Sequence, residues 1–183
     1  MVAGQTLMTQ FTWLSGRPSL DLCNTVSADE DLLQTPQDVS KWLATAGFPE
    51  PETTCMQDVQ RVRALRDALR GALVSHDAGE VATVVSDWLT AAPGHLAIDP
   101  ANLRASFCPD VNSCACMFVP TLLDAVEIAR EEIDRVRVCA AENCSVIYLD
   151  SSRNGSRRWC SMERCGARAK AHAYYERKRG RGD

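Results

Sequence analysis

CAAENCSVIYLDSSRNGSRRWCSMERC, residues 139–165, decides the fold of the last quarter of the chain. Two Cys-x4-Cys pairs frame this stretch, Cys139 with Cys144 and Cys160 with Cys165, and fifteen residues separate the pairs. A structural zinc ion takes four ligands in tetrahedral geometry, and four cysteine thiolates delivered by two chain reversals are a typical set. The spacing therefore predicts one structural Zn²⁺ on these four cysteines.

The residues between the two pairs predict a compact module around the metal. Ser145 to Leu149 has the pattern of a strand, Asn154-Gly155 is a turn signal, and Arg157 to Trp159 returns toward Cys160. Ser161 can then cap a helix that runs to about Lys178. We expect a β-hairpin followed by a helix, in which folding and metal binding are coupled.

The other cysteines show no second pair of this kind. The chain has nine cysteines, an odd number, and a reducing compartment disfavours a disulfide framework. Cys23 and Cys55 are interpreted as small hydrophobic residues. Cys108, Cys114 and Cys116 form a looser Cys-x5-Cys-x-Cys group, for which burial and a second metal or redox site both stay open.

The charge is divided unevenly along the chain. Residues 1–134 carry 8 Lys/Arg and 19 Asp/Glu, a net −11, whereas residues 135–183 carry 12 and 5, a net +7. A basic segment on an acidic body favours a polyanionic partner, although a solvated charged tail has the same composition.

Arginine supplies most of this basic charge, and its two-pronged guanidinium matches phosphate oxygens and guanine edges. On a continuous α-helix, Arg164, Arg168 and Tyr175 fall on one stripe. The sequence therefore predicts DNA as partner, with single-stranded RNA or an acidic protein as alternatives. The predicted nucleic-acid contacts are Arg153, Arg157, Arg158, Arg164, Arg168, Lys170 and Tyr175.

The first 134 residues are predicted to be mainly helical. Apolar residues at helical spacing and capping signals place helices at about 35–46, 52–75, 79–91 and after Pro120. A small hairpin is predicted over residues 96–107. We therefore expect a mainly α protein, with a helical domain over residues 1–134 and a zinc-binding ββα module over residues 135–183. In the helix after Pro120 the predicted buried positions are Leu122, Leu123, Val126, Ile128 and Ile133.

Residues 17–26 cluster apolar side chains without a clear period, so their pattern assigns no element. Asp21 and Asn24 lie inside this segment. Polar side chains in such short segments commonly satisfy buried backbone groups, and that is our first interpretation of both. Binding of a ligand is the alternative.

Several classes of protein are disfavoured by the sequence. No apolar run reaches the roughly 20 residues of a membrane span, and the first residues lack a signal-peptide pattern, which predicts a cytoplasmic protein. Four cysteines close the zinc shell, and no nucleophile, base and acid are grouped, so we do not expect an enzyme. The sequence does not determine the oligomeric state, and a homodimer is one of the states that it allows.

The same motifs resemble a known family. Cys-x4-Cys, Tyr148-Leu149-Asp150, Arg158-Trp159-Cys160 and Cys165-Gly166-Ala167-Arg168 resemble the CGNR zinc finger. Leu20 to Val26 and the helices after it resemble the ABATE domain, which precedes this finger in bacterial stress-induced transcription regulators. The resemblance implies a finger that binds zinc and DNA, and a body that senses a small-molecule effector or stress signal. Ala167 stands where the family name records asparagine, which leaves open how this finger recognises DNA.

Overall fold

Helices dominate the computed structural model, which describes residues 11–179 apart from residues 15, 28, 29 and 104. The α-helices are α1 (Pro18–Cys23), α2 (Pro36–Thr45), α3 (Met56–Val74), α4 (Ala78–Leu89), α5 (Cys114–Met117), α6 (Val119–Glu131) and α7 (Ala167–Arg179). The strands are β1 (Gly94–Ile98), β2 (Ala105–Pro109), β3 (Val136–Val138) and β4 (Ile147–Leu149). A short 3₁₀ turn η1 (Ile133–Arg135) precedes β3, and a π-helical turn η2 (Met162–Gly166) precedes α7.

The short helix α1 occupies the centre of the fold. It packs against α3, α6 and β4, and its residues from Ser19 to Cys23 are all buried. Pro18 begins the helix, because proline at the first helical position loses no hydrogen bond. A helix buried on every side has no polar face, which is why its sequence shows no period.

Stacked aromatic rings fill the core between α2, α4 and α6. The Trp42 ring lies between those of Trp13 and Phe118, with centroids 5.7 and 5.4 Å away. Trp88 meets Phe118 edge-on and donates its Nε1–H to the Ala115 carbonyl at 2.9 Å. These contacts bury α5, whose four residues include Cys114 and Cys116.

The predicted helices of the body are present, close to their predicted ends. Thr35 and Asp38 form a reciprocal capping box at the start of α2, with Pro36 in the first turn. Part of the predicted buried face of α6 is wrong, because Leu123 and Val126 are 41% and 39% exposed. Leu122 and Ile128 are buried as predicted, together with Val119, Thr121 and Ala125, whereas Ile133 lies beyond the helix in η1.

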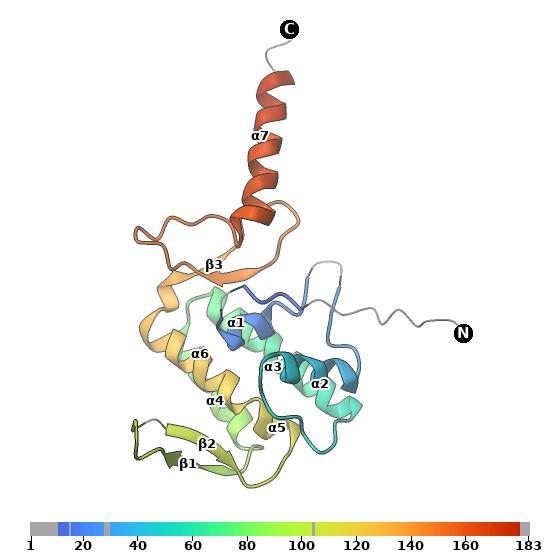
Figure 1. The fold of residues 1–183 in the computed structure, drawn as a ribbon, viewed down its shortest axis with the longest axis vertical. Helices are drawn as coiled ribbons and strands as arrows, with labels where there is room; N and C mark the ends of the chain where they lie inside the picture. Colours follow the sequence, from blue (N-terminus) through green and yellow to red (C-terminus); the bar gives the residue numbers. More distant parts are fainter. Residues whose placement is uncertain (1–10, 15, 28–29, 104, 180–183) are drawn as a thin grey trace, which may run out of the picture.

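The predicted hairpin over residues 96–107 is also present. Strands β1 and β2 pair antiparallel, and Leu96 lies opposite Phe107. The hairpin lies at the end of the body opposite α7 (Figure 1). Gly94 is required there, because a Cβ on it would lie 2.3 Å from the Phe107 ring.

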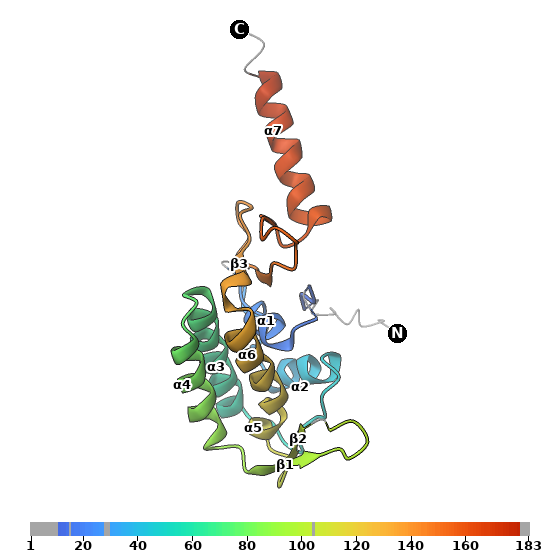
Figure 2. The same cartoon turned by 90° about the vertical axis from the view of Figure 1, so that its left-hand side faces the viewer.

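The hairpin predicted inside residues 145–159 is wrong in its pairing. Strand β4 pairs with β3, Val136 opposite Leu149, and not with residues 157–159. Val136 and Ile147 belong to the buried core of the body, so the two regions share a core. Helices α3, α4 and α6 run side by side below this junction, and α7 extends away from it (Figure 2).

In the described part of the chain, no helix combines the length and apolar character needed to cross a membrane.

Hydrogen bonds, of which those of Asn24 are fully buried, join the body to β3, β4 and Ser145. Asn24, 6% exposed, donates from Nδ2 to the Ile147 carbonyl at 2.9 Å and accepts the Ile147 N–H at Oδ1 at 2.8 Å. Arg70 donates to the carbonyls of Cys23 and Ser145, and His76 Nε2 lies 2.9 Å from the Val136 carbonyl. The Asn24 amide thus binds the free edge of β4 as a neighbouring strand would.

Replacing Asn24 with alanine should release this edge. The Ile147 N–H and C=O would lose their partner in a buried site, at a cost of about 1–3 kcal/mol for each group. We expect a lower free energy of unfolding in denaturant and faster hydrogen exchange at Ile147. Asn102→Ala, on the exposed β1–β2 turn, is the control. Unchanged exchange at Ile147 would contradict this role of Asn24.

A buried arginine ties α3 to the segment that follows α1. The Arg66 side chain is 2% exposed and donates to both Asp31 oxygens, at 2.7 and 3.0 Å, and to Asp67 at 2.8 Å. Arg63 also contacts Asp31 at 2.9 Å. Burial favours protonation of Asp31, but the hydrogen bonds from Arg66 and Leu33 and the two guanidinium charges outweigh it, so the pKa of Asp31 lies below its ordinary value.

Asp31→Asn should therefore destabilise the protein by about 3 kcal/mol, because it leaves the Arg66 charge buried with one partner. A depressed carboxyl pKa contributes stability above the unfolded-state pKa of about 3.9, and this contribution is lost as the pH falls through the folded-state value. The variant should show a smaller loss of stability on acidification than the wild type, measured by urea unfolding across the acid range. Asp67→Asn removes a carboxylate that is 60% exposed and should cost less than about 1 kcal/mol.

Candidate metal centre

Four cysteine sulfurs converge between β3 and α7. In the described part of the chain, Cys139, Cys144, Cys160 and Cys165 form the one cluster with metal-ligand geometry, their sulfurs within 4.8 Å of one another. Two sulfur–sulfur distances are 3.8 Å, from Cys144 to Cys160, and 3.6 Å, from Cys160 to Cys165. Tetrahedral ligands about 2.3 Å from zinc lie about 3.8 Å apart. The sulfurs are therefore already spaced for one zinc ion.

A tight turn after β3 brings the first two ligands together. Cys139 extends the β3–β4 pairing, its N–H bonding to the Val146 carbonyl at 2.9 Å. The chain then reverses through Asn143, whose positive φ of 59° asparagine tolerates better than most residues, and the Cys144 N–H bonds to Ala141. Cys144 is thereby turned back toward Cys139.

A π-helical turn brings the second pair together. The helix predicted from Ser161 is capped as expected, by a hydrogen bond from Arg164 N–H to Ser161 Oγ, but its first residues are not α-helical. Gly166 N–H bonds to the Ser161 carbonyl, an i to i+5 closure. A turn of this width draws together residues five apart, which is the separation of Cys160 and Cys165. A Cβ on Gly166 would lie 2.8 Å from Met162 Sδ, so a larger residue there would displace the exposed Met162 side chain.

A buried carboxylate shapes the loop between the two pairs. Asp150 is fully buried and accepts the N–H groups of Ser152 and Arg157, each at 2.9 Å. These hydrogen bonds, those to Ser152 foremost, hold the pKa of Asp150 below its ordinary value. The Asp150 carboxylate thus takes the Arg157 N–H that the predicted return strand would offer, and β3 and Asn24 take the two edges of β4.

Arg157 also belongs to the inside of the finger. Its guanidinium lies 4.7 Å from the Tyr148 ring centroid and donates to the carbonyls of Trp159 and Cys160. Tyr148 in turn donates its hydroxyl to the Arg157 carbonyl at 2.6 Å. The sequence did not show these contacts, because an arginine among other arginines has the pattern of an exposed basic surface.

The electrostatics of the cluster favour a bound cation. Burial and the neighbouring sulfurs of Cys165 and Cys139 raise the pKa of Cys160, so four thiolates are unfavourable together without a positive charge. The Arg168 guanidinium supplies part of this positive charge, with Nη2 3.7 Å from Cys165 Sγ, and the Cys160 N–H donates a hydrogen bond to Cys139 Sγ at 3.3 Å. A Zn²⁺ ion would supply the rest and hold the four ligands as thiolates.

Comparison with known families agrees with this geometry. A family model for the CGNR zinc finger matches residues 135–178. A second model, ABATE, described as "Putative stress-induced transcription regulator", matches residues 16–137, which is more than half of the chain. This protein belongs to the ABATE family. No curated protein matches it.

The metal centre is thus that of the CGNR finger of an ABATE protein, and its four cysteines bind one zinc ion. Both matched families are of regulator or zinc-finger type and not enzymes. The two matches overlap at residues 135–137, where β3 lies. Ala167, in place of the family's asparagine, is exposed and begins α7.

The structure separates the other predicted site residues into three groups. Arg153, Arg158, Arg164, Arg168, Lys170 and Tyr175 lie on the finger with exposed or half-buried side chains. Asp21 and Asn24 are buried and bond to backbone, Asp21 accepting from Leu14 N–H at 3.2 Å. Cys114 and Cys116 are buried in α5 and Cys108 lies in β2, and no second metal cluster is found among the described residues. Burial raises the pKa of Cys114 to about 12, as expected for an inert thiol.

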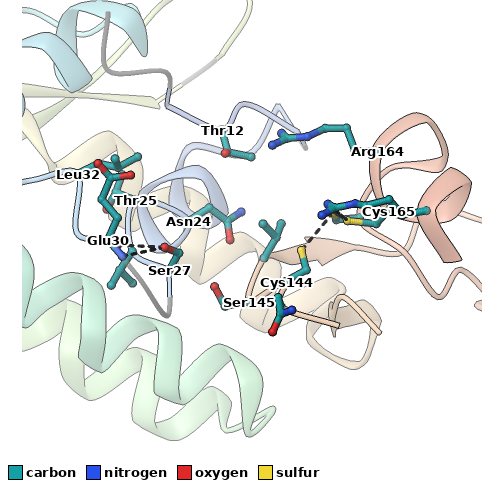
Figure 3. Close-up of a pocket in the computed structure, with 15 residues that line it drawn as sticks. Thr12, Asn24, Thr25, Ser27, Glu30, Leu32, Cys144, Ser145, Arg164 and Cys165 are labelled. Atoms are coloured by element: carbon teal, nitrogen blue, oxygen red, sulfur yellow. Dashed lines mark hydrogen bonds between the residues drawn. The ribbon is translucent and has the colours of Figure 1, made fainter. Parts of the chain in front are cut away.

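A cleft of about 590 Å³ separates the metal centre of the ABATE protein from its body. Cys144, Cys165 and Arg164 line one side, and Thr25, Ser27 and Glu30 line the other (Figure 3). The Arg164 side chain reaches across toward Thr12 (Figure 3). We name this space the body–finger cleft.

Purified protein should carry one zinc per chain, measured by inductively coupled plasma mass spectrometry. Cys160→Ser replaces a thiolate with a hydroxyl and should weaken zinc binding by more than about 100-fold, the most that loss of an outer-shell partner usually costs. Competition with a chromogenic chelator measures this change. Cys55→Ser, at an exposed cysteine outside the cluster, should keep full affinity. Equal affinity in both variants would contradict the assigned ligand set.

Proposed function

We propose that this protein is a DNA-binding transcription regulator in which the helical body controls a basic zinc finger. The observation that carries the proposal is helix α7, which extends away from the rest of the chain (Figures 1 and 2). Its main neighbour is η2, the turn that precedes it. An α-helix is the element that fits the major groove of duplex DNA.

The composition of α7 supports this role. Its sequence, ARAKAHAYYERKR, has five Lys/Arg and one Glu, and no apolar face that the body could bury. An isolated helix of this length is marginally stable in water, and a helix that is polar on all sides needs a polar or charged partner to gain from packing. The phosphate backbone of DNA is such a partner.

The basic residues on the surface of the finger form the proposed contact set. Arg153 and Arg158 lie on the loop before Cys160, Arg164 lies in η2, and Arg168 and Lys170 lie in the first turn of α7. In the described part of the chain, none of these five forms an ion pair with a carboxylate. Arg157 is left out of the set, because its guanidinium is committed to Tyr148 and to backbone carbonyls.

The body has the opposite charge and is proposed to regulate the finger. Residues 1–134 form the proposed regulatory domain and residues 135–183 the finger, although Val136 and Ile147 give them a common core. Because the acidic body repels phosphate, DNA should be held chiefly along α7, which extends away from the body, with Arg164 and Arg168 at the edge that faces the cleft. A stress signal or effector that acts on the body would reach the finger through β3 and β4. We place this regulator in the bacterial cytoplasm.

DNA binding is tested by fluorescence anisotropy with genomic duplex fragments across a salt series. Affinity should fall steeply with salt, and Lys170→Ala should weaken binding and reduce the slope of log affinity against log salt by about 0.9, the loss of one phosphate contact. Lys41→Ala on α2, an exposed lysine of the body, is the matched control. Zinc content is measured in both.

Three outcomes would overturn this proposal. Absence of binding to any genomic duplex at low salt would exclude a DNA-binding regulator. Tighter binding to unpaired RNA than to duplex would point to an RNA-binding factor, for which exposed Tyr175 could stack on bases. Stoichiometric co-purification of an acidic protein, without a DNA shift, would indicate an interaction adaptor.

A further inference from the structure

Three of the four zinc ligands line the body–finger cleft. Cys144, Cys160 and Cys165 contribute to its wall, whereas Cys139 does not. Their exposure differs: Cys160 and Cys165 are 3% and 2% exposed and Cys139 is 6% exposed, while Cys144 is only half-buried. Among the three ligands that line the cleft, Cys144 is therefore the most exposed residue.

The neighbours of each sulfur sharpen this difference. Arg168 lies against Cys165 Sγ, and the Cys160 N–H points at Cys139 Sγ. Cys144 follows the exposed turn residue Asn143, and its sulfur is 3.8 Å from Cys160 Sγ. Of the ligands that line the cleft, Cys144 is therefore the residue most accessible to a small molecule, and a second sulfur lies 3.8 Å from its own.

We propose that Cys144 is an oxidant-modification site, at which hydrogen peroxide entering the body–finger cleft oxidises the zinc finger and releases its metal. A small uncharged peroxide fits a cleft of this volume and needs no charged partner to enter it. The proposal rests on the zinc site alone and does not depend on DNA binding.

The chemistry is a two-step thiolate oxidation. The Cys144 thiolate attacks one peroxide oxygen, the O–O bond breaks, hydroxide leaves, and the sulfur becomes a sulfenic acid. The Cys160 thiolate then attacks the Cys144 sulfur, the S–O bond breaks, a second hydroxide leaves, and a Cys144–Cys160 disulfide forms. Two thiolates are oxidised by two electrons in total and one peroxide is reduced to two hydroxides. Two thiolates remain, too few for a closed structural site.

Among the described residues, no cysteine outside the metal centre belongs to a cluster of this kind. Cys23 is fully buried, and burial raises its pKa to about 12, as it does for Cys114. Cys55 is exposed at the start of α3, where its sulfur lies 3.2 Å from Asp58. Cys55 is therefore a useful internal standard for an ordinary exposed thiol.

The test treats the zinc-loaded full chain with graded hydrogen peroxide in the absence of DNA. A chromogenic chelator reports zinc release, and timed differential alkylation with peptide mass spectrometry reports which cysteine is modified first. We expect zinc release at least as fast as oxidation of Cys55, Cys144 as the first ligand modified, and a Cys144–Cys160 disulfide at the end. Zinc retained while Cys55 is fully oxidised, or another ligand modified ahead of Cys144, would overturn the proposal.

A ligand exchange separates modification at Cys144 from general loss of zinc. Cys144→His keeps a Cys₃His set, which structural zinc accepts, and removes the accessible sulfur. It should retain zinc and slow its release by peroxide at least about tenfold, because imidazole is not the nucleophile that thiolate is. Release at the wild-type rate would overturn the proposal. If the variant binds no zinc, the order of modification in the wild type decides, and Cys55→Ser should leave the release rate unchanged.

Discussion

Two hydrogen bonds between the Asn24 side chain and the backbone of Ile147 hold the finger on the body. Asn24 follows α1, whose position is set by burial against α3 and α6. Ile147 begins β4, which positions Cys139 through β3 and leads into the Asp150 loop. The orientation of the metal centre, the width of the cleft and the direction of α7 all depend on this junction.

The sequence predicted the parts of the fold that local chemistry determines. Capping at Thr35, the helix periods of the body and the two cysteine pairs each depend on residues close together in the chain. Helix α1 escaped prediction because a segment buried on every side shows no period. The contact of Asn24 with Ile147 escaped it because the two residues lie 123 positions apart, and the expected hairpin does not form because β3 pairs with one edge of β4 and Asn24 binds the other. For the proposed contact surface, sequence alone could not separate Arg157, which binds carbonyls, from its exposed neighbour Arg158.

The uneven charge of the chain acquires a spatial meaning in the structure. The acidic body and basic finger meet at the body–finger cleft, where Glu30 lies on one side and Arg164 and Arg168 lie on the other. Arg168 also lies beside a zinc thiolate, whose negative charge it partly offsets. Arg168 therefore helps to neutralise the negative charge of the zinc thiolates, whereas α7 from Lys170 onward extends away from the metal centre.

The Asp150 loop bears on how readily the finger can recover its metal. A flexible loop of fifteen residues between the two cysteine pairs would have to lose conformational entropy each time the finger binds zinc. Here Asp150 ties Ser152 to Arg157, and Arg157 is fixed to Tyr148 and to the carbonyls of Trp159 and Cys160, so much of that loop is held by contacts other than metal ligation. The two cysteine pairs are consequently preorganised neighbours, and a finger stripped of zinc and then reduced should reload from a partly folded state instead of from an open chain.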